Sequence, residues 1–142
     1  LDYNGLGFSL EAHPVSFLKN LIPGKSIMEI KKTSSKELLK ARGLITNRQR
    51  PKTAKGTVFI TMEDETGSLN LIVSSNLFEE NKETILQSIF ISVEGYWEKD
   101  KTVESNYFYN CYGNFIVSSI QNQTGLLTNF FNTSSWKTRD FH

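Results

Sequence analysis

Apolar and polar residues alternate along several stretches of this chain, with the period of two that is typical of a strand with one buried face. In the first stretch, one side carries Leu39, Ala41, Gly43 and Ile45. The other side carries Lys40, Arg42, Leu44, Thr46, Arg48 and Arg50. Pro51 ends this predicted strand, because proline has no amide hydrogen to donate to a neighbouring strand.

The alternation returns after the basic loop PKTAKG and again after the turn sequence DETG, so the first three predicted strands form a meander. Val58, Ile60 and Met62 form the apolar side of the second strand, where Phe59 and Thr61 lie on the outward side. The third strand spans residues 68–73. Two further strands are predicted over residues 89–97 and 107–120, with a polar hairpin between them.

Residues 74–88, SSNLFEENKETILQS, follow a helical period instead. Ser75 or Asn76 is suited to cap this helix, and Glu79 and Glu80 lie in its first turn, where the helix dipole favours acids. A second short helix is predicted over residues 10–22. The tail from Gln121 has weak periodicity, and we expect it to be mobile or to lie over the surface.

Three strands, a helix and two further strands are the element order of the OB-fold, a five-stranded Greek-key barrel with its helix between strands 3 and 4. We therefore predict a lead-in with a short helix over residues 1–36, an OB-fold domain over residues 37–120 and a polar tail over residues 121–142. The ligand surface of this fold is formed by strands 2 and 3, flanked by the loops that join strands 1 and 2 and strands 4 and 5.

The composition narrows the function classes. A hydrophobic share of 38% is ordinary for a globular domain. The single cysteine, Cys111, excludes an internal disulfide and a multi-cysteine zinc site. No segment has the apolar length of a membrane span or the pattern of a signal peptide, so we expect a cytoplasmic protein without a membrane partner. The chain does not begin with Met, and we expect it to be part of a longer protein.

The net charge of +1 conceals a division along the chain. Between Lys25 and Lys55 there are ten basic residues and two acids, whereas between Glu63 and Glu104 there are ten acids and three lysines. This segregation favours a basic face for a polyanion, although two solvated faces with no partner would show the same pattern.

An OB groove holds single-stranded nucleic acid with cations that follow the phosphates and with aromatic rings on which bases stack. Phe59 is the predicted stacking ring, although it would be a core ring if the strand had the opposite phase. Arg48 and Arg50 are predicted to reach phosphates or bases, and Lys52 and Lys55 lie at the rim. The predicted nucleic-acid-binding residues are Arg42, Thr46, Arg48, Arg50, Lys52, Lys55, Phe59, Thr61 and Asn70. We expect no catalytic residue, metal or cofactor, since the acids Glu63 to Glu65 fit a solvated turn better than a metal site.

The sequence GLITNRQRPKTAKGTVFITMEDETG, residues 43–67, resembles the C-terminal OB domain of the alpha subunit of bacterial C-family DNA polymerase III, and most closely its error-prone, damage-tolerant branch. DYNGLGFSLEAHP near the start and RDFH at the end are similar to the flanks of that domain. More distantly, the second strand resembles the anticodon-binding OB modules of class II aminoacyl-tRNA synthetases. In those modules the residues that match Phe59 and Asn70 contact bases.

The resemblance implies a monomeric, non-catalytic domain that binds single-stranded template DNA during translesion synthesis and DNA repair. Its partners would then be the DNA, the rest of the polymerase chain and replisome or damage-response proteins. The catalytic aspartates of such a polymerase belong to its palm, which this fragment does not contain. Two alternatives stay open, namely an OB module that docks proteins and one that binds RNA or tRNA.

Overall fold

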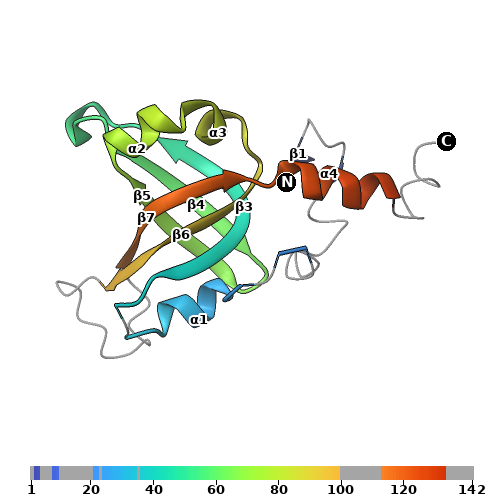
Figure 1. The fold of residues 1–142 in the computed structure, drawn as a ribbon, viewed down its shortest axis with the longest axis horizontal. Coiled ribbons are helices and arrows are strands. Elements are labelled where there is room, and N and C mark those ends of the chain that lie inside the picture. The colour runs from blue at the N-terminus through green and yellow to red at the C-terminus, as the bar shows by residue number, and fades with distance from the viewer. Residues whose placement is uncertain are drawn as a thin grey trace.

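The computed structural model describes residues 2–3, 8–9, 21–22, 24–34, 36–99 and 113–133, and for residues 2–3, 8–9 and 131–133 it describes the backbone alone. Figure 1 shows a barrel with short helices at both of its ends. The predicted helix over residues 10–22 and the start of the predicted last strand, residues 107–112, lie largely or wholly outside the described residues. Two short strands, β1 (Asp2–Tyr3) and β2 (Phe8–Ser9), pair with each other near the beginning of the chain.

Five strands close the barrel. They are β3 (Leu39–Gln49), β4 (Val58–Asp64), β5 (Gly67–Val73), β6 (Phe90–Lys99) and β7 (Gly113–Asn122). Their order around the barrel is β3-β4-β5-β7-β6, and β6 pairs with β3 to complete the closure. Every pairing is antiparallel except that of β5 with β7. This topology confirms the predicted OB-fold.

The helix predicted between the third and fourth barrel strands is present as two short segments, α2 (Ser75–Glu80) and α3 (Lys82–Gln87), which cross one end of the barrel (Figure 1). The cap is Ser74 instead of the predicted Ser75 or Asn76, and its Oγ accepts a hydrogen bond from the Leu77 amide. Glu79 and Glu80 lie at the end of α2 and not in its first turn as predicted. Asn81, with φ −128° and ψ 31°, divides the two segments. Phe78 and Ile85 point into the barrel core and are buried there.

The other end of the barrel is closed by helix α1 (Ile27–Lys31), which the sequence analysis did not predict. Its signal is the short capping box at Ser26 and Glu29, in which each side chain accepts a hydrogen bond from the other residue's backbone amide. The hydrogen bonds from Ser26 hold the pKa of the Glu29 carboxyl below its ordinary value. Ile27 and Ile30 are fully buried in the core cluster.

Gly95 allows a close approach of two strands. A Cβ atom built on this residue would lie 2.1 Å from the carbonyl oxygen of Ile116, a distance that no side chain tolerates. The pairing register of β6 with β7 shifts between Glu94 and Gly95, so the glycine lies at an irregularity of the strand. The barrel therefore needs glycine here for packing rather than for a special backbone angle.

Within the predicted polar tail, residues 124–133 form helix α4 (Thr124–Thr133), an element that the sequence analysis did not predict. The hydroxyl of Thr124 accepts hydrogen bonds from the amides of Ile89 and Phe90, which attach the start of the helix to the barrel. Leu127 of α4 is fully buried, as are Leu44 and Phe90, which pair across β3 and β6 on the outside of the barrel. The apolar side of α4, interrupted by Thr and Asn, is too short to give a clear periodic signal.

Candidate nucleic-acid interface

The outer surface of β4 and β5 brings together three of the predicted site residues. Phe59 pairs with Ile72, and Thr61 pairs with Asn70, across the antiparallel strands. Directly opposed residues lie on the same side of a sheet, so these four side chains share the outer face. Asn70 is exposed, and Phe59, Thr61 and Ile72 are half-buried. The alternation of inward Val58, Ile60 and Met62 with outward Phe59 and Thr61 is as predicted from sequence.

Two amide side chains that the sequence analysis did not select, Asn47 and Gln49, complete this face from β3. Asn47 pairs with Thr61 and Gln49 with Phe59. The register of β3 shifts between Ile45 and Asn47, which marks a β-bulge at Thr46. The extra residue reverses the inward and outward phase of the strand. Thr46 itself is half-buried and donates a hydrogen bond to the carbonyl of Thr61 at 3.4 Å.

A hollow of about 230 Å³ lies at the centre of this face. It is lined by Asn47, Gln49, Phe59, Ile60, Thr61, Asn70 and Asn114. We call these residues, together with Ile72, the β4–β5 face. The hollow is smaller than a typical small-molecule pocket of roughly 300–1,000 Å³. Its lining of one aromatic ring and several amides suits a flat group with hydrogen-bonding edges.

Arg48 is exposed, but its side chain points toward the end of the barrel and does not share the β4–β5 face with Phe59 as predicted. After the bulge it pairs with the inward residue Ile60. Its guanidinium lies at the end of the barrel, where Nε donates to the carbonyl of Ile85 at 2.7 Å and Nη2 donates to the carbonyl of Ser88. These carbonyls are at the C-terminal end of α3, where a cation is favoured. Arg48 therefore joins α3 to the barrel.

Arg42 points outward as predicted, but it is not accessible, since this side chain is 3% exposed. Residues 24–27 pass over it, and its Nη1 donates to the carbonyl of Lys25 at 3.2 Å. The same nitrogen lies 3.8 Å from Oδ2 of Asp64, a carboxylate that is itself buried. Strand β3 alone gave no sign that the lead-in would cover this position.

Asp64 is buried and does not belong to a solvated turn as predicted, because its carboxylate joins the start of α1 to the β4–β5 turn. Its Oδ2 accepts a hydrogen bond from the Ile27 amide at 2.9 Å, at the start of α1. Its Oδ1 accepts from the amides of Thr66 and Gly67 in the β4–β5 turn. Within the described residues, no three His, Cys, Asp or Glu side chains gather closely enough to hold a metal ion.

Three of the predicted cations, Arg50, Lys52 and Lys55, are exposed on the loop between β3 and β4. This loop contains a 3-10 turn, η2 (Lys52–Ala54), and Lys52 and Lys55 are both exposed. Arg50 lies 4.5 Å from the centre of the Phe78 ring, and its Nη2 lies 3.5 Å from Oε1 of Glu79. Since 46% of the Arg50 side chain is exposed, it remains accessible to a further anion.

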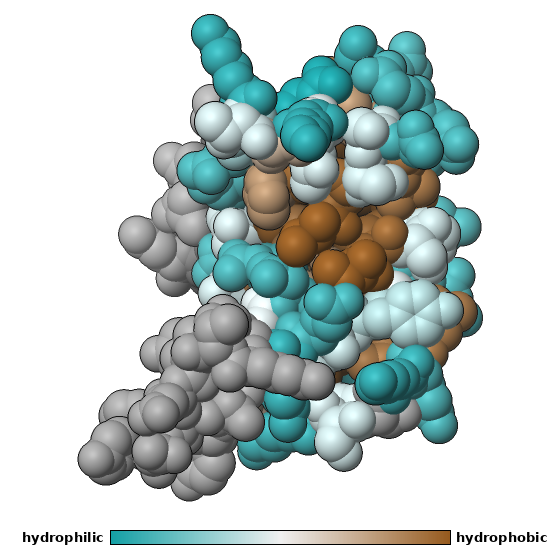
Figure 2. Space-filling view, turned by 90° about the vertical axis from the view of Figure 1, so that its left-hand side faces the viewer, coloured by the Kyte–Doolittle hydropathy of each residue, from teal (hydrophilic) through white to brown (hydrophobic). Residues whose placement is uncertain are grey.

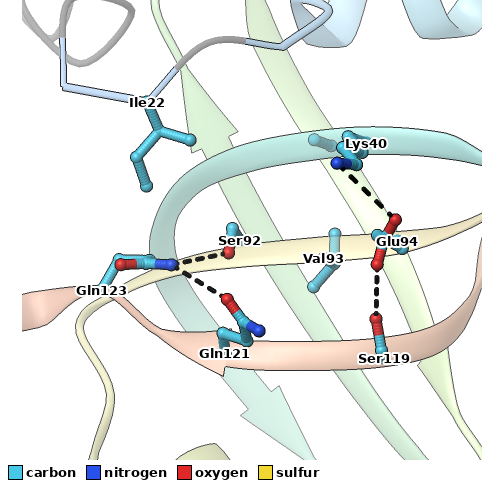
Figure 3. Close-up of a pocket in the computed structure, with 9 residues that line it drawn as sticks. Ile22, Lys40, Ser92, Val93, Glu94, Ser119, Gln121 and Gln123 are labelled. Atoms are coloured by element: carbon cyan, nitrogen blue, oxygen red, sulfur yellow. Dashed lines mark hydrogen bonds and ion pairs between the residues drawn. The ribbon is translucent and has the colours of Figure 1, made fainter.

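A second hollow lies on the outer surface of β3, β6 and β7 (Figure 3). Its polar side chains are bonded to one another. Gln123 Nε2 donates to Ser92 at 3.0 Å and to Gln121 at 3.3 Å. Glu94 accepts from Ser119 at 3.2 Å and lies 4.0 Å from Lys40. This mutual pairing leaves the hollow less suited to a ligand than the β4–β5 face.

Comparison with known proteins agrees with the topology. A family model described as "OB-fold nucleic acid binding domain" matches residues 39–110. The chain belongs to this family. Among curated proteins, it is 38% identical over 106 residues to the error-prone DNA polymerase of Xanthomonas campestris pv. campestris strain B100, covering 72% of the chain and 10% of that polymerase. The error-prone DNA polymerase of Bordetella parapertussis is 34% identical over 100 residues, covering 68% of the chain and 10% of the polymerase.

These matches confirm the resemblance to error-prone DNA polymerases, of which the chain spans about a tenth of the length. Among solved structures, asparaginyl-tRNA synthetase from Pyrococcus horikoshii superposes with a TM-score of 0.56 at 18% identity, covering 72% of this chain and 22% of that one. The OBody AM3L15 superposes with a TM-score of 0.52 at 9% identity, covering 70% and 87%. At these identities the structures support the fold alone. Among the described residues, no helix has both the length and the apolar character needed to cross a membrane.

Proposed function

We propose that this domain binds single-stranded DNA on the β4–β5 face and belongs to an error-prone DNA polymerase, in which it positions the template and performs no chemistry. The observation that carries the proposal is the half-buried ring of Phe59 at the centre of a face lined by the amides Asn47, Gln49 and Asn70. The family membership and the polymerase relatives support the proposal independently of this face.

Phe59 offers a stacking surface to any base, and stacking of this kind is worth roughly 1–3 kcal/mol per base. The surrounding amides carry both donors and acceptors, which suit the exposed edges of an unpaired base. A duplex hides both its base faces and its pairing edges. The face therefore favours a single strand over a duplex.

The phosphates of the bound strand would approach the loop between β3 and β4, where Arg50, Lys52 and Lys55 are accessible. Arg42 is buried beneath the lead-in, and Arg48, although exposed, donates to backbone carbonyls at the end of α3, so the cationic contribution to binding is smaller than the sequence predicts. Binding then depends more on stacking and on base edges than on charge. In the cell, the partners would be the template in the bacterial cytoplasm and the remainder of the polymerase chain, with accessory proteins at other surfaces.

The test compares the affinity of the domain for a labelled single-stranded oligonucleotide with its affinity for the matching duplex. We expect tighter binding of the single strand, and a loss of roughly 1–3 kcal/mol of binding free energy in Phe59→Ala. Leu86→Ala is the matched control, because Leu86 is a 54%-exposed apolar residue on α3 and outside the β4–β5 face. Circular dichroism at increasing urea shows whether each variant keeps its fold.

Equal affinity for single strand and duplex, or an unchanged affinity in a folded Phe59→Ala variant, would contradict the proposal. A preference for a ribose oligonucleotide of the same sequence would point to RNA instead, since the 2′-hydroxyl is the group that differs. Failure of every oligonucleotide to bind would leave an OB module that docks proteins.

A further inference from the structure

The row of outward side chains that contains Phe59 does not stop at β5. Phe59 pairs with Ile72 across β4 and β5, Ile72 pairs with Ile116 across β5 and β7, and Ile116 pairs with Tyr96 across β7 and β6. Each pair lies on one side of the sheet, so the four side chains form a continuous row on the outside of the barrel. Two aromatic rings lie at its ends with two isoleucines between them.

The members of this row are accessible to different degrees. Tyr96 is 43% exposed, whereas the next residue, Trp97, points inward and is 6% exposed. Phe59, Ile72 and Ile116 are half-buried. Figure 2, which shows the side of the barrel where β5 and β7 lie in Figure 1, has hydrophobic side chains gathered at its centre with polar side chains around them. An exposed ring at the end of an apolar row has no role in the core.

We propose that Tyr96 is a second stacking platform and that a single strand bound at Phe59 continues along this row to reach it. The inference rests on the proposed function. Neighbouring strands are about 4.8 Å apart, so three spacings place the two rings roughly 14 Å apart around the barrel. One nucleotide is too small to contact both rings. The occupant is therefore a strand of several nucleotides, which an OB domain of ordinary site size accommodates.

The negative charge of Glu98, beside Tyr96, determines which bases can stack on the Tyr96 ring. Glu98 is exposed, lies two residues along β6 on the same face as Tyr96, and pairs with Asn114 across β6 and β7. A carboxylate repels a phosphate but accepts hydrogen bonds from an exocyclic amino group, as with cytosine N4. The base on Tyr96 is therefore one with an amino group on its edge, and thymine is disfavoured there.

The experiment varies the length of the oligonucleotide. A dinucleotide reaches only one ring, and a hexanucleotide reaches both. We expect Tyr96→Thr, which keeps a strand-favouring side chain, to bind oligo-dC hexanucleotide about five-fold or more weakly than the wild type. Its affinity for a dinucleotide should stay within about two-fold, because the dinucleotide binds at Phe59. Tyr96→Phe keeps the ring and should restore hexanucleotide binding.

Glu98→Gln tests the base preference. The wild type should bind oligo-dC hexanucleotide more tightly than oligo-dT, and the variant should lose most of that difference because the neutral amide is a weaker acceptor than the carboxylate. As a measurement free of any variant, the backbone amide of Tyr96 in the wild type should shift on titration with the hexanucleotide and not with the dinucleotide.

A folded Tyr96→Thr variant that binds every length like the wild type, while Phe59→Ala binds weakly, would overturn this inference and leave the proposed function intact. The same conclusion follows if the Tyr96 amide shift is absent with the hexanucleotide. If Phe59→Ala also binds like the wild type, the proposed function falls, and the inference falls with it.

Discussion

Two outer faces of the same barrel differ in their exposure to solvent. On the β4–β5 face, Phe59 keeps part of its ring exposed and Asn70 is open to solvent. On the outside of β3 and β6, Leu44 and Phe90 are fully buried where α4 packs against β6, and Arg42 lies beneath residues 24–27. Both faces are made of alternating strands. They differ because residues 24–27 and helix α4, which belong to the described parts of the chain before and after the barrel, cover the second face.

Strand β3 contributes to both faces, and its bulge at Thr46 separates the two contributions. Before the bulge, Arg42 points outward and is covered by the lead-in. After it, Asn47 and Gln49 point outward and Arg48 points toward the barrel end. The comparison teaches that a run of cations in a sequence does not produce a cationic surface, because two of the arginines hold the fold together.

Replacement of Asp64, on the covered face, should cause the largest loss of stability. In Asp64→Ala, the buried guanidinium of Arg42 loses its counter-charge and α1 loses the acceptor of its first amide. Breaking a buried ion pair by removing one partner costs about 3–5 kcal/mol. We expect the free energy of unfolding, measured by circular dichroism in urea, to fall by that amount.

Glu63→Ala is the control for this change. Glu63 is next to Asp64 and half-buried on the outer side of β4, and surface substitutions change stability by about 0.5 kcal/mol. An unfolding free energy of Asp64→Ala close to that of the control would show that the buried pair does not hold the lead-in to the barrel.

Arg48→Ala should also lower stability and leave the salt dependence of DNA binding unchanged. The variant loses charge-assisted hydrogen bonds to the carbonyls of Ile85 and Ser88, each worth about 1.5–3 kcal/mol. Arg50→Ala is the matched comparison, because Arg50 lies on the loop between β3 and β4 in an exposed ion pair with Glu79 and should affect binding more than folding. If Arg48→Ala reduced the salt slope and spared stability, its guanidinium would contact phosphate after all.

The exposed loop should carry most of the charge contribution to binding. If Arg50, Lys52 and Lys55 each neutralise one phosphate, together they give a log–log slope of affinity against salt of about −2, at about −0.7 per phosphate. The double variant Lys52→Ala with Lys55→Ala should reduce the magnitude of that slope by about 1.4.

Lys40→Ala is the control for the loop variants, because its side chain is 74% exposed on the other face, beside Glu94. Equal reductions of the slope in the loop variants and in Lys40→Ala would mean that the salt effect comes from overall charge rather than from a located contact.

The smallest expected effect is at Glu79, whose carboxylate lies 3.5 Å from the guanidinium of Arg50. This exposed pair competes with a phosphate for Arg50. In Glu79→Gln the arginine is released, and affinity should rise by less than about 1 kcal/mol, the scale of a surface ion pair. Isothermal titration in low salt resolves such a change. Weaker binding in this variant would indicate that Glu79 positions Arg50 for its contact instead of competing with DNA.

The sequence predicted the parts of the site that depend on uninterrupted alternation. Phe59 and Thr61 on β4, and Asn70 on β5, lie where a period of two places them. The fold class was also accessible, because the order of elements is characteristic and residues 74–88 follow a helical period, although the cap is Ser74 and not Ser75 or Asn76.

The errors have two physical causes. A bulge has no strong signal in composition, so the change of phase that turns Arg48 toward the barrel end and brings Asn47 and Gln49 outward could not be predicted from alternation. Coverage is a tertiary property, so the burial of Arg42 by residues 24–27 depended on the path of the lead-in. The capping box at Ser26 was the one available signal for helix α1, which follows the segment that covers Arg42.

The most direct test of the central claim is a map of backbone amide shifts during titration of the domain with a single-stranded oligonucleotide. The account predicts the largest shifts at Phe59, Thr61 and Asn70 on the β4–β5 face, and small shifts at Lys40, Glu94 and Ser119 on the outside of β3, β6 and β7. Shifts concentrated at the second group, with the amides around Phe59 unchanged, would contradict it.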